Sequence, residues 1–143
     1  MTIDLILNKF RATGVRVTTA RKNISKIIVN STSPISANDI NTQLEARAIN
    51  INKTTIYREL KFLIDKQIIK QIDFGEGIKR YEMSNLDHHH HLVCLKCKNT
   101  FDISIEEDII NVDQITLQKD LEFKVFYHSL EFFGECKGCQ KKL

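Results

Sequence analysis

The stretch HHHHLVCLKC, residues 88–97, and the later CKGC, residues 136–139, carry the strongest structural signal in this sequence of 143 residues. Each stretch contains two cysteines separated by two residues, and the chain has no other cysteine. Two such pairs bring four thiolates to one tetrahedral ion, which is the ligand arrangement of structural zinc. The pattern therefore predicts a closed zinc site formed by Cys94, Cys97, Cys136 and Cys139.

Disulfide bonds and a thioredoxin-type redox motif are the alternatives for these cysteines. A redox motif needs only one pair, and disulfides are rare in cytosolic proteins. The first residues, MTIDLILNKFRATG, lack the basic, apolar and small-residue order of a secretory signal. No stretch reaches the roughly 20 apolar residues of a membrane span. The sequence therefore predicts a cytoplasmic protein with no membrane partner and with zinc in place of disulfides.

Four of the five histidines form a run directly ahead of the first cysteine pair. If this run is extended, alternation with period two places His89 and His91 on one side and His88 and His90 on the other. Four clustered histidines favour a metal-binding function. The run can therefore supply ligands to two separate metal sites.

Each side of the histidine run has candidate partners. For His89 and His91 these are Asp87, which alternates in phase with them, Glu82, at the end of the preceding strand-like run, and Asp102, five residues past Cys97. Imidazoles with carboxylates suit Fe²⁺, Mn²⁺, Zn²⁺ or Ni²⁺, and a mixed set is typical of exchangeable sites. For the opposite side, the candidates are His128 and one acid among Glu106, Glu107 and Asp108.

Charge is divided unevenly along the chain, although the net charge is only +3. Residues 1–83 carry 14 lysines and arginines against 8 acids, a net of +6, whereas residues 84–143 carry 7 against 10, a net of −3. Such asymmetry suggests that one half faces a polyanion. We therefore expect two domains, 1–83 and 84–143.

Residues 1–83 show four helical patterns followed by a hairpin. Apolar residues recur at three- and four-residue spacing in each pattern, and Ser36 and Asn52 are placed as helix N-caps. IIKQIDF (68–74) and IKRYEM (78–83) are strand-like runs separated by Gly75-Glu76-Gly77. This order is that of a winged helix-turn-helix, in which the last helix enters the major groove of DNA.

The last helical pattern, 53–67, has one apolar and one polar, basic face. The polar face is either an ordinary solvated surface or a DNA-binding surface. On the second interpretation, Arg16 reaches the DNA backbone or the minor groove from outside this helix. The candidate DNA contacts are Arg16, Thr54, Thr55, Tyr57, Arg58 and Lys61.

The residues between the two cysteine pairs predict a strand over 91–103, a helix-like acidic stretch from 105 to about 122, and a strand over 123–133. A core of roughly 60 residues is marginal, so a bound metal and a partner subunit would stabilise it. The whole chain is therefore expected to be α+β, with the zinc joining the first strand of this half to its tail.

With these features the chain resembles the ferric uptake regulator family, from about Arg16 to Cys139. The matching stretches are Val17-Thr18 with Arg21, TIYREL (55–60), HHHHLVCLKC (88–97) and CKGC (136–139). Together they are highly specific. The resemblance implies homodimeric repressors with an N-terminal winged helix, a C-terminal α/β dimerisation domain, a four-cysteine structural zinc and one or two regulatory metal sites.

The resemblance also implies roles for individual residues. Tyr57 and Arg58 match DNA-contacting positions, and the four cysteines match the structural zinc ligands. Glu82, His89, His91 and Asp102 match the main sensing site. The residues that match a second site are His88, His90, His128 and an acid near Glu107.

One position departs from the family pattern. Many relatives have a histidine just ahead of the third helix that completes the sensing site, and this chain has Pro34 there. No histidine occurs in residues 1–87 to replace it. Glu82, at the hinge between the domains, is therefore expected to couple the metal to the DNA-binding half.

The expected function is that of a metal-responsive DNA-binding repressor that controls metal homeostasis, with iron as the leading signal. Its expected cofactors are structural Zn²⁺ and a second divalent ion, Fe²⁺, Mn²⁺ or Zn²⁺. Its expected partners are a double-stranded DNA operator and further copies of the chain, as a homodimer or a tetramer. Peroxide sensing and zinc sensing are alternatives within the family, and the acid at the position of Asp102 tends to be aspartate in peroxide sensors.

A zinc-dependent hydrolase is the rival from another class, with Glu106 or Glu107 as general base. The chain has no HExxH motif, no nucleophile motif and no glycine-rich phosphate loop. The sequence therefore predicts a protein that is not an enzyme.

Overall fold

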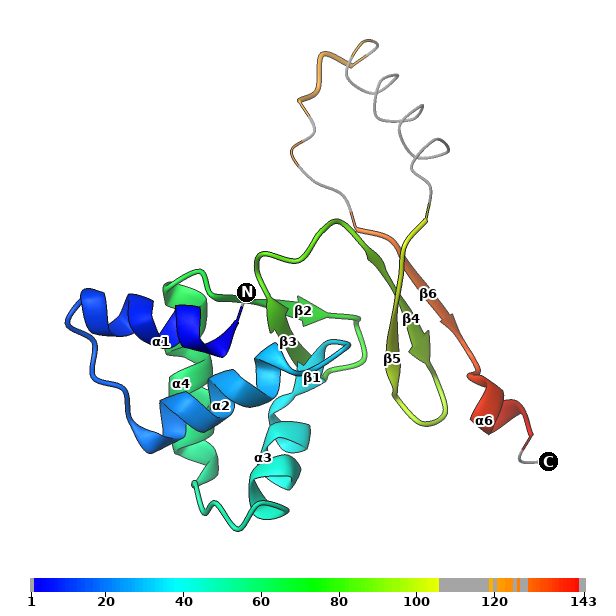
Figure 1. Ribbon diagram of the computed structural model, residues 1–143. Coiled ribbons are helices and arrows are strands. Elements are labelled where there is room, and N and C mark those ends of the chain that lie inside the picture. Colours follow the sequence, from blue (N-terminus) through cyan, green and yellow to red (C-terminus); the bar gives the residue numbers. More distant parts are fainter. Residues whose placement is uncertain (1, 106–118, 120, 125, 127–128, 142–143) are drawn as a thin grey trace. The chain divides into compact units, whose positions relative to one another are not determined.

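The computed structural model describes residues 2–105, 119, 121–124, 126 and 129–141. The chain divides into two compact units, Met1–Asp87 and His88–Leu143 (Figure 1). Charge balance predicts domains 1–83 and 84–143, and the separate function of each domain stays a prediction. Within the described ranges, no helix combines the length and the apolar character that crossing a membrane requires.

The first unit has four helices, and each of them begins at a side-chain cap. Thr2, Thr18, Ser36 and Asn52 each accept a hydrogen bond from a backbone N–H of the first helical turn. Ser36 also forms a capping box with Asp39. The predicted caps at Ser36 and Asn52 are therefore confirmed. The helices are α1 (Ile3–Ala12), α2 (Thr19–Val29), α3 (Ala37–Glu45) and α4 (Lys53–Asp65).

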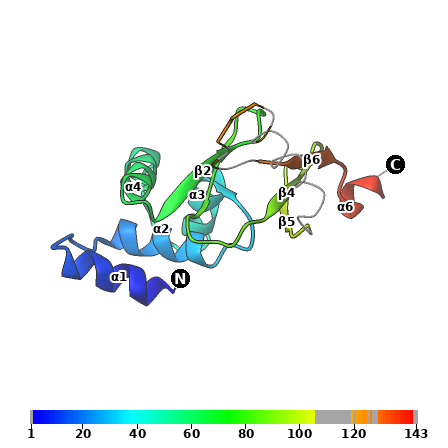
Figure 2. The same cartoon turned by 90° about the horizontal axis from the view of Figure 1, so that it is seen from above.

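The apolar stripes of the four helices meet in one core. Ile24, Ile40 and Leu63 are completely buried in it, and Tyr81 and Met83 from the sheet are also buried there. Helices α1 and α2 lie side by side in both views (Figures 1 and 2). Because burial of each Leu or Ile side chain contributes roughly 1.5–3 kcal/mol, the stripes fix which face of α4 remains outside.

A three-stranded antiparallel sheet completes the first unit, in the order β1-β3-β2. β1 (Ile35–Ser36) pairs with β3 (Lys79–Met83), which pairs with β2 (Ile69–Asp73). The turn between β2 and β3 places Gly75 and Gly77 at φ 76° and 73°, a region that glycine adopts without strain. This order confirms the winged helix-turn-helix. β1 was not predicted, because two residues are too few to show alternation.

The second unit has β4 (His90–Cys94) between antiparallel β5 (Thr100–Ile103) and parallel β6 (Glu131–Gly134), as Figure 1 shows, and α6 (Lys137–Gln140) follows β6. The combination of helices and strands confirms the α+β class. The prediction of one strand over 91–103 is wrong, because a turn separates β4 from β5.

The predicted strand over 123–133 is also wrong in its extent. Among the described residues of that range, only 131–133 belong to a strand, and β6 continues to Gly134. Most of the helix-like stretch predicted from 105 to about 122 lies outside the described residues.

Candidate functional site

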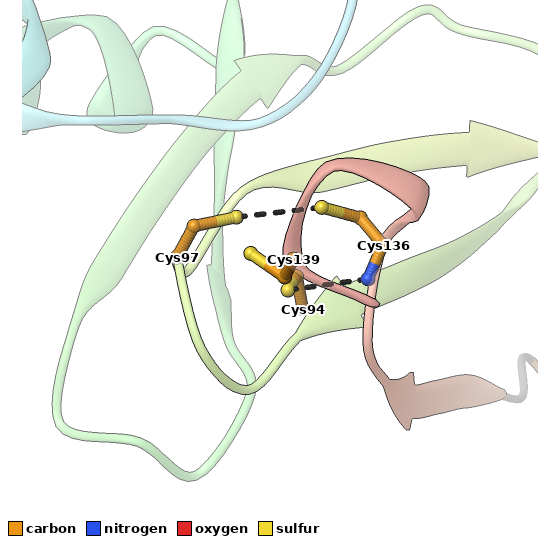
Figure 3. A group of neighbouring side chains, drawn as sticks. All are labelled: Cys94, Cys97, Cys136 and Cys139. Atoms are coloured by element: carbon orange, nitrogen blue, oxygen red, sulfur yellow. Dashed lines mark hydrogen bonds between the residues drawn. The ribbon is translucent and has the colours of Figure 1, made fainter. Parts of the chain in front are cut away.

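The four cysteines come from two backbone turns of the second unit. Cys94 ends β4 and Cys97 lies in the following turn, whereas Cys136 directly precedes α6 and Cys139 lies within it. The Lys98 N–H donates to the Cys94 carbonyl over 2.9 Å, and the Cys139 N–H donates to the Cys136 carbonyl over 2.8 Å. Figure 3 shows that these tight turns direct all four sulfur atoms toward one another.

The positions of the four sulfur atoms fit a zinc ion. All four lie within 4.8 Å of one another, and Cys97 Sγ is 3.7 Å from Cys136 Sγ. Sulfur ligands roughly 2.3 Å from zinc at tetrahedral angles lie about 3.8 Å apart. All four residues are free cysteines. The group therefore fits structural zinc, and its four protein ligands leave no open position for catalysis.

The cysteines also shift one another's ionisation. Backbone N–H groups, first that of Cys136 and then that of Cys97, lower the pKa of Cys94 to about 6. The Cys136 N–H donates to Cys94 Sγ over 3.4 Å. Hydrogen bonds with Cys97 and Cys136 raise the pKa of Cys139 to about 12. Four thiolates so close together would repel one another, and a bound cation would offset that repulsion.

The histidine run alternates between two sides, as its sequence predicts. The rings of His89 and His91 lie 4.9 Å apart, and those of His88 and His90 lie 4.7 Å apart. The antiparallel pairing of β4 with β5 places Asp102 directly opposite His91. The register of one hairpin therefore brings an acid to the side that carries His89 and His91.

Asp102 faces both histidines of this side. Its Oδ1 lies 3.8 Å from His91 Nε2, and its Oδ2 lies 4.0 Å from His89 Nε2. Both distances exceed a hydrogen-bond length and leave room for an ion between the ligand atoms. The side chains of His91 and His89 are 8% and 11% exposed, whereas that of Asp102 is 29% exposed and remains partly accessible to solvent. This donor set fits an exchangeable divalent metal.

Glu82, the remaining candidate ligand of this site, belongs to the first unit. It lies on β3, opposite Lys70 of β2. Its carboxylate is buried, and Lys70 Nζ lies 2.9 Å from its Oε1. This ion pair compensates the burial of the charge. The participation of Glu82 in the metal site stays a prediction.

The second predicted site is only partly described. His90 is buried and His88 is exposed. Glu107 and His128, the other two candidate ligands, lie outside the described residues. A second regulatory site therefore stays a prediction.

The candidate DNA contacts lie at the surface of the first unit. On α4, Tyr57 is 56% exposed, Thr54, Arg58 and Lys61 are exposed, and Thr55 is half-buried. Arg16 is exposed in the segment between α1 and α2. Because Ile56, Leu60 and Leu63 are buried on the opposite face of α4, this polar face is free to meet a partner.

Sequence reasoning missed several charged pairs among the described residues, including two that involve a buried glutamate. Lys70 was not recognised beside Glu82, because only the strand register brings them together. The ion pair of Arg21 with Glu59 was also missed. Its signal was present in the sequence, since Glu59 falls on the buried stripe of α4, where a charged residue needs a partner.

The sequence profile of the ferric uptake regulator family matches residues 12–133. The chain belongs to the ferric uptake regulator family. It is 29% identical over 144 residues to the ferric uptake regulation protein of Bacillus subtilis (strain 168), covering 98% of this chain and 95% of that protein. It is 31% identical over 136 residues to the peroxide operon regulator of the same organism, covering 95% and 92%.

A solved structure shows the same fold. The Helicobacter pylori ferric uptake regulator matches with a TM-score of 0.81 at 23% identity, over 99% of this chain and 96% of that chain. Members of the ferric uptake regulator family are dimeric, metal-responsive, DNA-binding regulators of transcription. This chain has a winged helix, a four-cysteine group that fits zinc and a histidine–carboxylate group that fits a regulatory metal.

Proposed function

We propose that this chain represses genes of metal homeostasis when a divalent ion, with iron as the first candidate, is bound by His89, His91 and Asp102 together with Glu82. The observation that carries the proposal is the group of two imidazoles that face one carboxylate, 3.8 and 4.0 Å away. Because imidazole and carboxylate ligands exchange metal more readily than four thiolates, this group is the proposed sensor.

The four cysteines are proposed as the ligands of a permanent zinc ion that supports the sensor. Cys94 lies three residues after His91 on β4. β4 also pairs with the strand of Asp102. A zinc ion at the end of this hairpin would therefore hold His91 and Asp102 in register. Its expected contribution is folding energy, since the second unit is small.

Glu82 is proposed as the link between metal binding and DNA binding. It lies near the end of β3, and only residues 84–87 separate that strand from His88. Ligands on both sides of so short a connection would restrict it when they hold one ion. Residues 1–87 contain no histidine, and Pro34 stands where many relatives have a histidine ligand. Metal binding would then raise the population of the form in which this connection is restricted. The free energy of this shift cannot exceed the preference of the ion for that form.

The outer face of α4 is proposed as the surface that enters the major groove. Tyr57 offers an apolar ring with a hydroxyl group, while Arg58 and Lys61 offer charges to phosphates or base edges. Arg16 is proposed to contact the backbone or the minor groove beside this helix. Two winged helices in a homodimer would read two half-sites of a double-stranded operator. The DNA partner implies a cytoplasmic location.

Metal-dependent DNA binding tests the proposal. The operator probe is a duplex selected from a randomised library by the Mn²⁺-loaded wild-type protein. Under anaerobic conditions, fluorescence anisotropy should show tight binding with Fe²⁺ or Mn²⁺ and weak binding after a chelator has removed the exchangeable ion. Zinc analysis before and after chelation serves as the control that the four-cysteine site is intact. Equal affinity with and without the exchangeable ion contradicts the proposal.

Peroxide sensing is a second candidate, and two observations favour it. The sensor acid is the aspartate Asp102, and the peroxide operon regulator of Bacillus subtilis is as similar to this chain as the ferric uptake regulation protein is. In this case peroxide would oxidise His89 or His91 and release the DNA. Mass spectrometry of the Fe²⁺-loaded protein after peroxide treatment should then find added oxygen on one of these histidines. Unmodified histidines with intact DNA binding would exclude it.

Zinc sensing by the same ligands is distinguished by the metal series of the first experiment. It requires operator binding to follow Zn²⁺ at concentrations at which Fe²⁺ and Mn²⁺ have no effect.

A second regulatory site formed by His88, His90, Glu107 and His128 is part of the proposal. It predicts a further exchangeable ion for each chain.

A further inference from the structure

Arg21, in the first turn of α2, contacts two other segments of the first unit. Its Nε and Nη2 donate to the two carboxylate oxygens of Glu59 over 2.9 and 3.3 Å. Its Nη1 donates to the carbonyl oxygen of Arg16 over 2.7 Å. Its guanidinium also lies 3.8 Å from the centre of the Phe62 ring. One side chain thus joins α4 to the segment that carries Arg16.

The ion pair of Arg21 with Glu59 is largely buried within the first unit. Arg21 and Glu59 have side chains only 12% and 7% exposed, and Glu59 lies on the face of α4 that carries Ile56 and Leu60. A buried ion pair is a weak source of stability, because desolvation offsets much of the attraction. The pair instead fixes the relative positions of the groups that it joins, because the planar guanidinium sets the directions of several hydrogen bonds at once.

The segment between α1 and α2 is held at both ends around Arg16. On one side, the Val15 N–H donates to the Phe10 carbonyl over 2.8 Å. On the other, the Arg16 carbonyl accepts from Arg21. The Arg16 side chain itself remains exposed. The backbone of Arg16 is therefore fixed to α4 through Arg21 and Glu59, while its charge is free to meet a phosphate.

We infer that Arg21 is a positioning residue for DNA recognition: with Glu59, it sets where Arg16 meets the duplex relative to the contacts made by α4. The inference rests on the proposed DNA contact of Arg16. Arg21 does not need to contact DNA, because three of its N–H groups are already bonded within the unit. Its effect on DNA binding therefore passes through Arg16.

A double-mutant cycle tests this dependence in the full-length, zinc-loaded, Mn²⁺-loaded protein. Arg21→Gln and Glu59→Gln are introduced together, so that no unpaired carboxylate is left buried. The probe is the duplex selected by the wild-type protein. Arg16→Ala should weaken binding about tenfold, the equivalent of roughly 1.4 kcal/mol, and the Arg21/Glu59 double variant should weaken it similarly. The triple variant should bind no more weakly than Arg16→Ala alone.

The matched control removes an exposed pair of opposite charges from the end of α3. Glu45→Gln with Arg47→Gln leaves the net charge unchanged, as does the Arg21/Glu59 double variant, and should leave DNA affinity unchanged. Arg21→Lys is the second test variant, because lysine keeps the charge but lacks the fork that reaches Glu59 and Arg16 together. When it is combined with Arg21→Lys, Arg16→Ala should cause little further loss of DNA affinity. Thermal unfolding establishes that each variant is folded at the assay temperature.

Three results overturn the inference. Full additivity of the losses, in the triple variant or in the Arg21→Lys background, shows that Arg21 acts independently of Arg16. Wild-type affinity of the folded Arg21/Glu59 variant shows that the ion pair has no role in DNA binding. If Arg16→Ala binds DNA with wild-type affinity, Arg16 does not contact the DNA. This result alone also contradicts the proposed DNA interface.

Discussion

The substitution Asp102→Asn tests the sensor with the smallest change in shape. The carboxylate of Asp102 lies 3.8 Å from His91 Nε2 and 4.0 Å from His89 Nε2, so one carboxylate is placed to share an ion with both imidazoles. Asparagine keeps an oxygen atom and the side-chain volume but removes the charge. The side chain is 29% exposed, so the dielectric constant of bulk water gives the smallest effect to expect. A divalent ion about 3 Å from a unit charge gains roughly 2.8 kcal/mol in that medium.

This loss corresponds to about hundredfold weaker binding of the exchangeable metal. Calorimetric titration of the zinc-loaded protein with Mn²⁺ measures it directly, and zinc analysis shows that the cysteine site is unaffected. Asp4→Asn is the control, because it removes the same charge from an exposed position in α1. Wild-type Mn²⁺ affinity in Asp102→Asn, or an equal loss in Asp4→Asn, would refute the assignment of Asp102 as a ligand.

Four further outcomes are expected. Cys97→Ser should lose zinc, measured by plasma mass spectrometry, and should lower the midpoint of thermal unfolding, because metal binding supplies folding energy; full zinc retention contradicts the four-cysteine site. Lys70→Met removes the ammonium 2.9 Å from Glu82 and should raise Mn²⁺ affinity severalfold in calorimetry, since a competing cation is gone; weaker binding counts against Glu82 as a ligand. Lys61→Ala should reduce the log-log slope of DNA affinity against salt by about 0.9 for each subunit, or about 1.8 for the dimer, and an unchanged slope places Lys61 outside the interface. Ile40→Ala empties a fully buried position and should cost about 2–5 kcal/mol of unfolding free energy in urea titrations; a negligible loss contradicts the core.

The helices of the first unit were predictable because their signals are local. Ser36 and Asn52 cap helices whose apolar spacing lies within a few turns of chain. The strands of the second unit were predicted less well. The turn at residues 95–97 interrupts what reads as one extended segment, and the parallel pairing of β6 with β4 joins residues about 40 positions apart. No local pattern specifies such a pairing.

The grouping of the candidate metal ligands was predictable because spacing and chemistry agree. Two CxxC pairs specify one ion, and the alternation of the histidine run separates His89 and His91 from their neighbours. The charged partners were not predictable in the same way. Lys70 meets Glu82 through strand register, and Arg21 meets Glu59 through the packing of α2 on α4. The sequence shows that Glu59 needs a partner, but which residue becomes the partner depends in both cases on how the strands pair and the helices pack.

The metal dependence of operator binding in His91→Ala tests the central claim most directly. His91 lies on β4 directly opposite Asp102, the proposed sensor acid, and it is three residues from Cys94, so zinc analysis must accompany the assay. If the histidine–carboxylate group is the sensor, His91→Ala retains its zinc but binds the operator weakly at every Mn²⁺ or Fe²⁺ concentration. Metal-dependent operator binding at wild-type concentrations in this variant would contradict it.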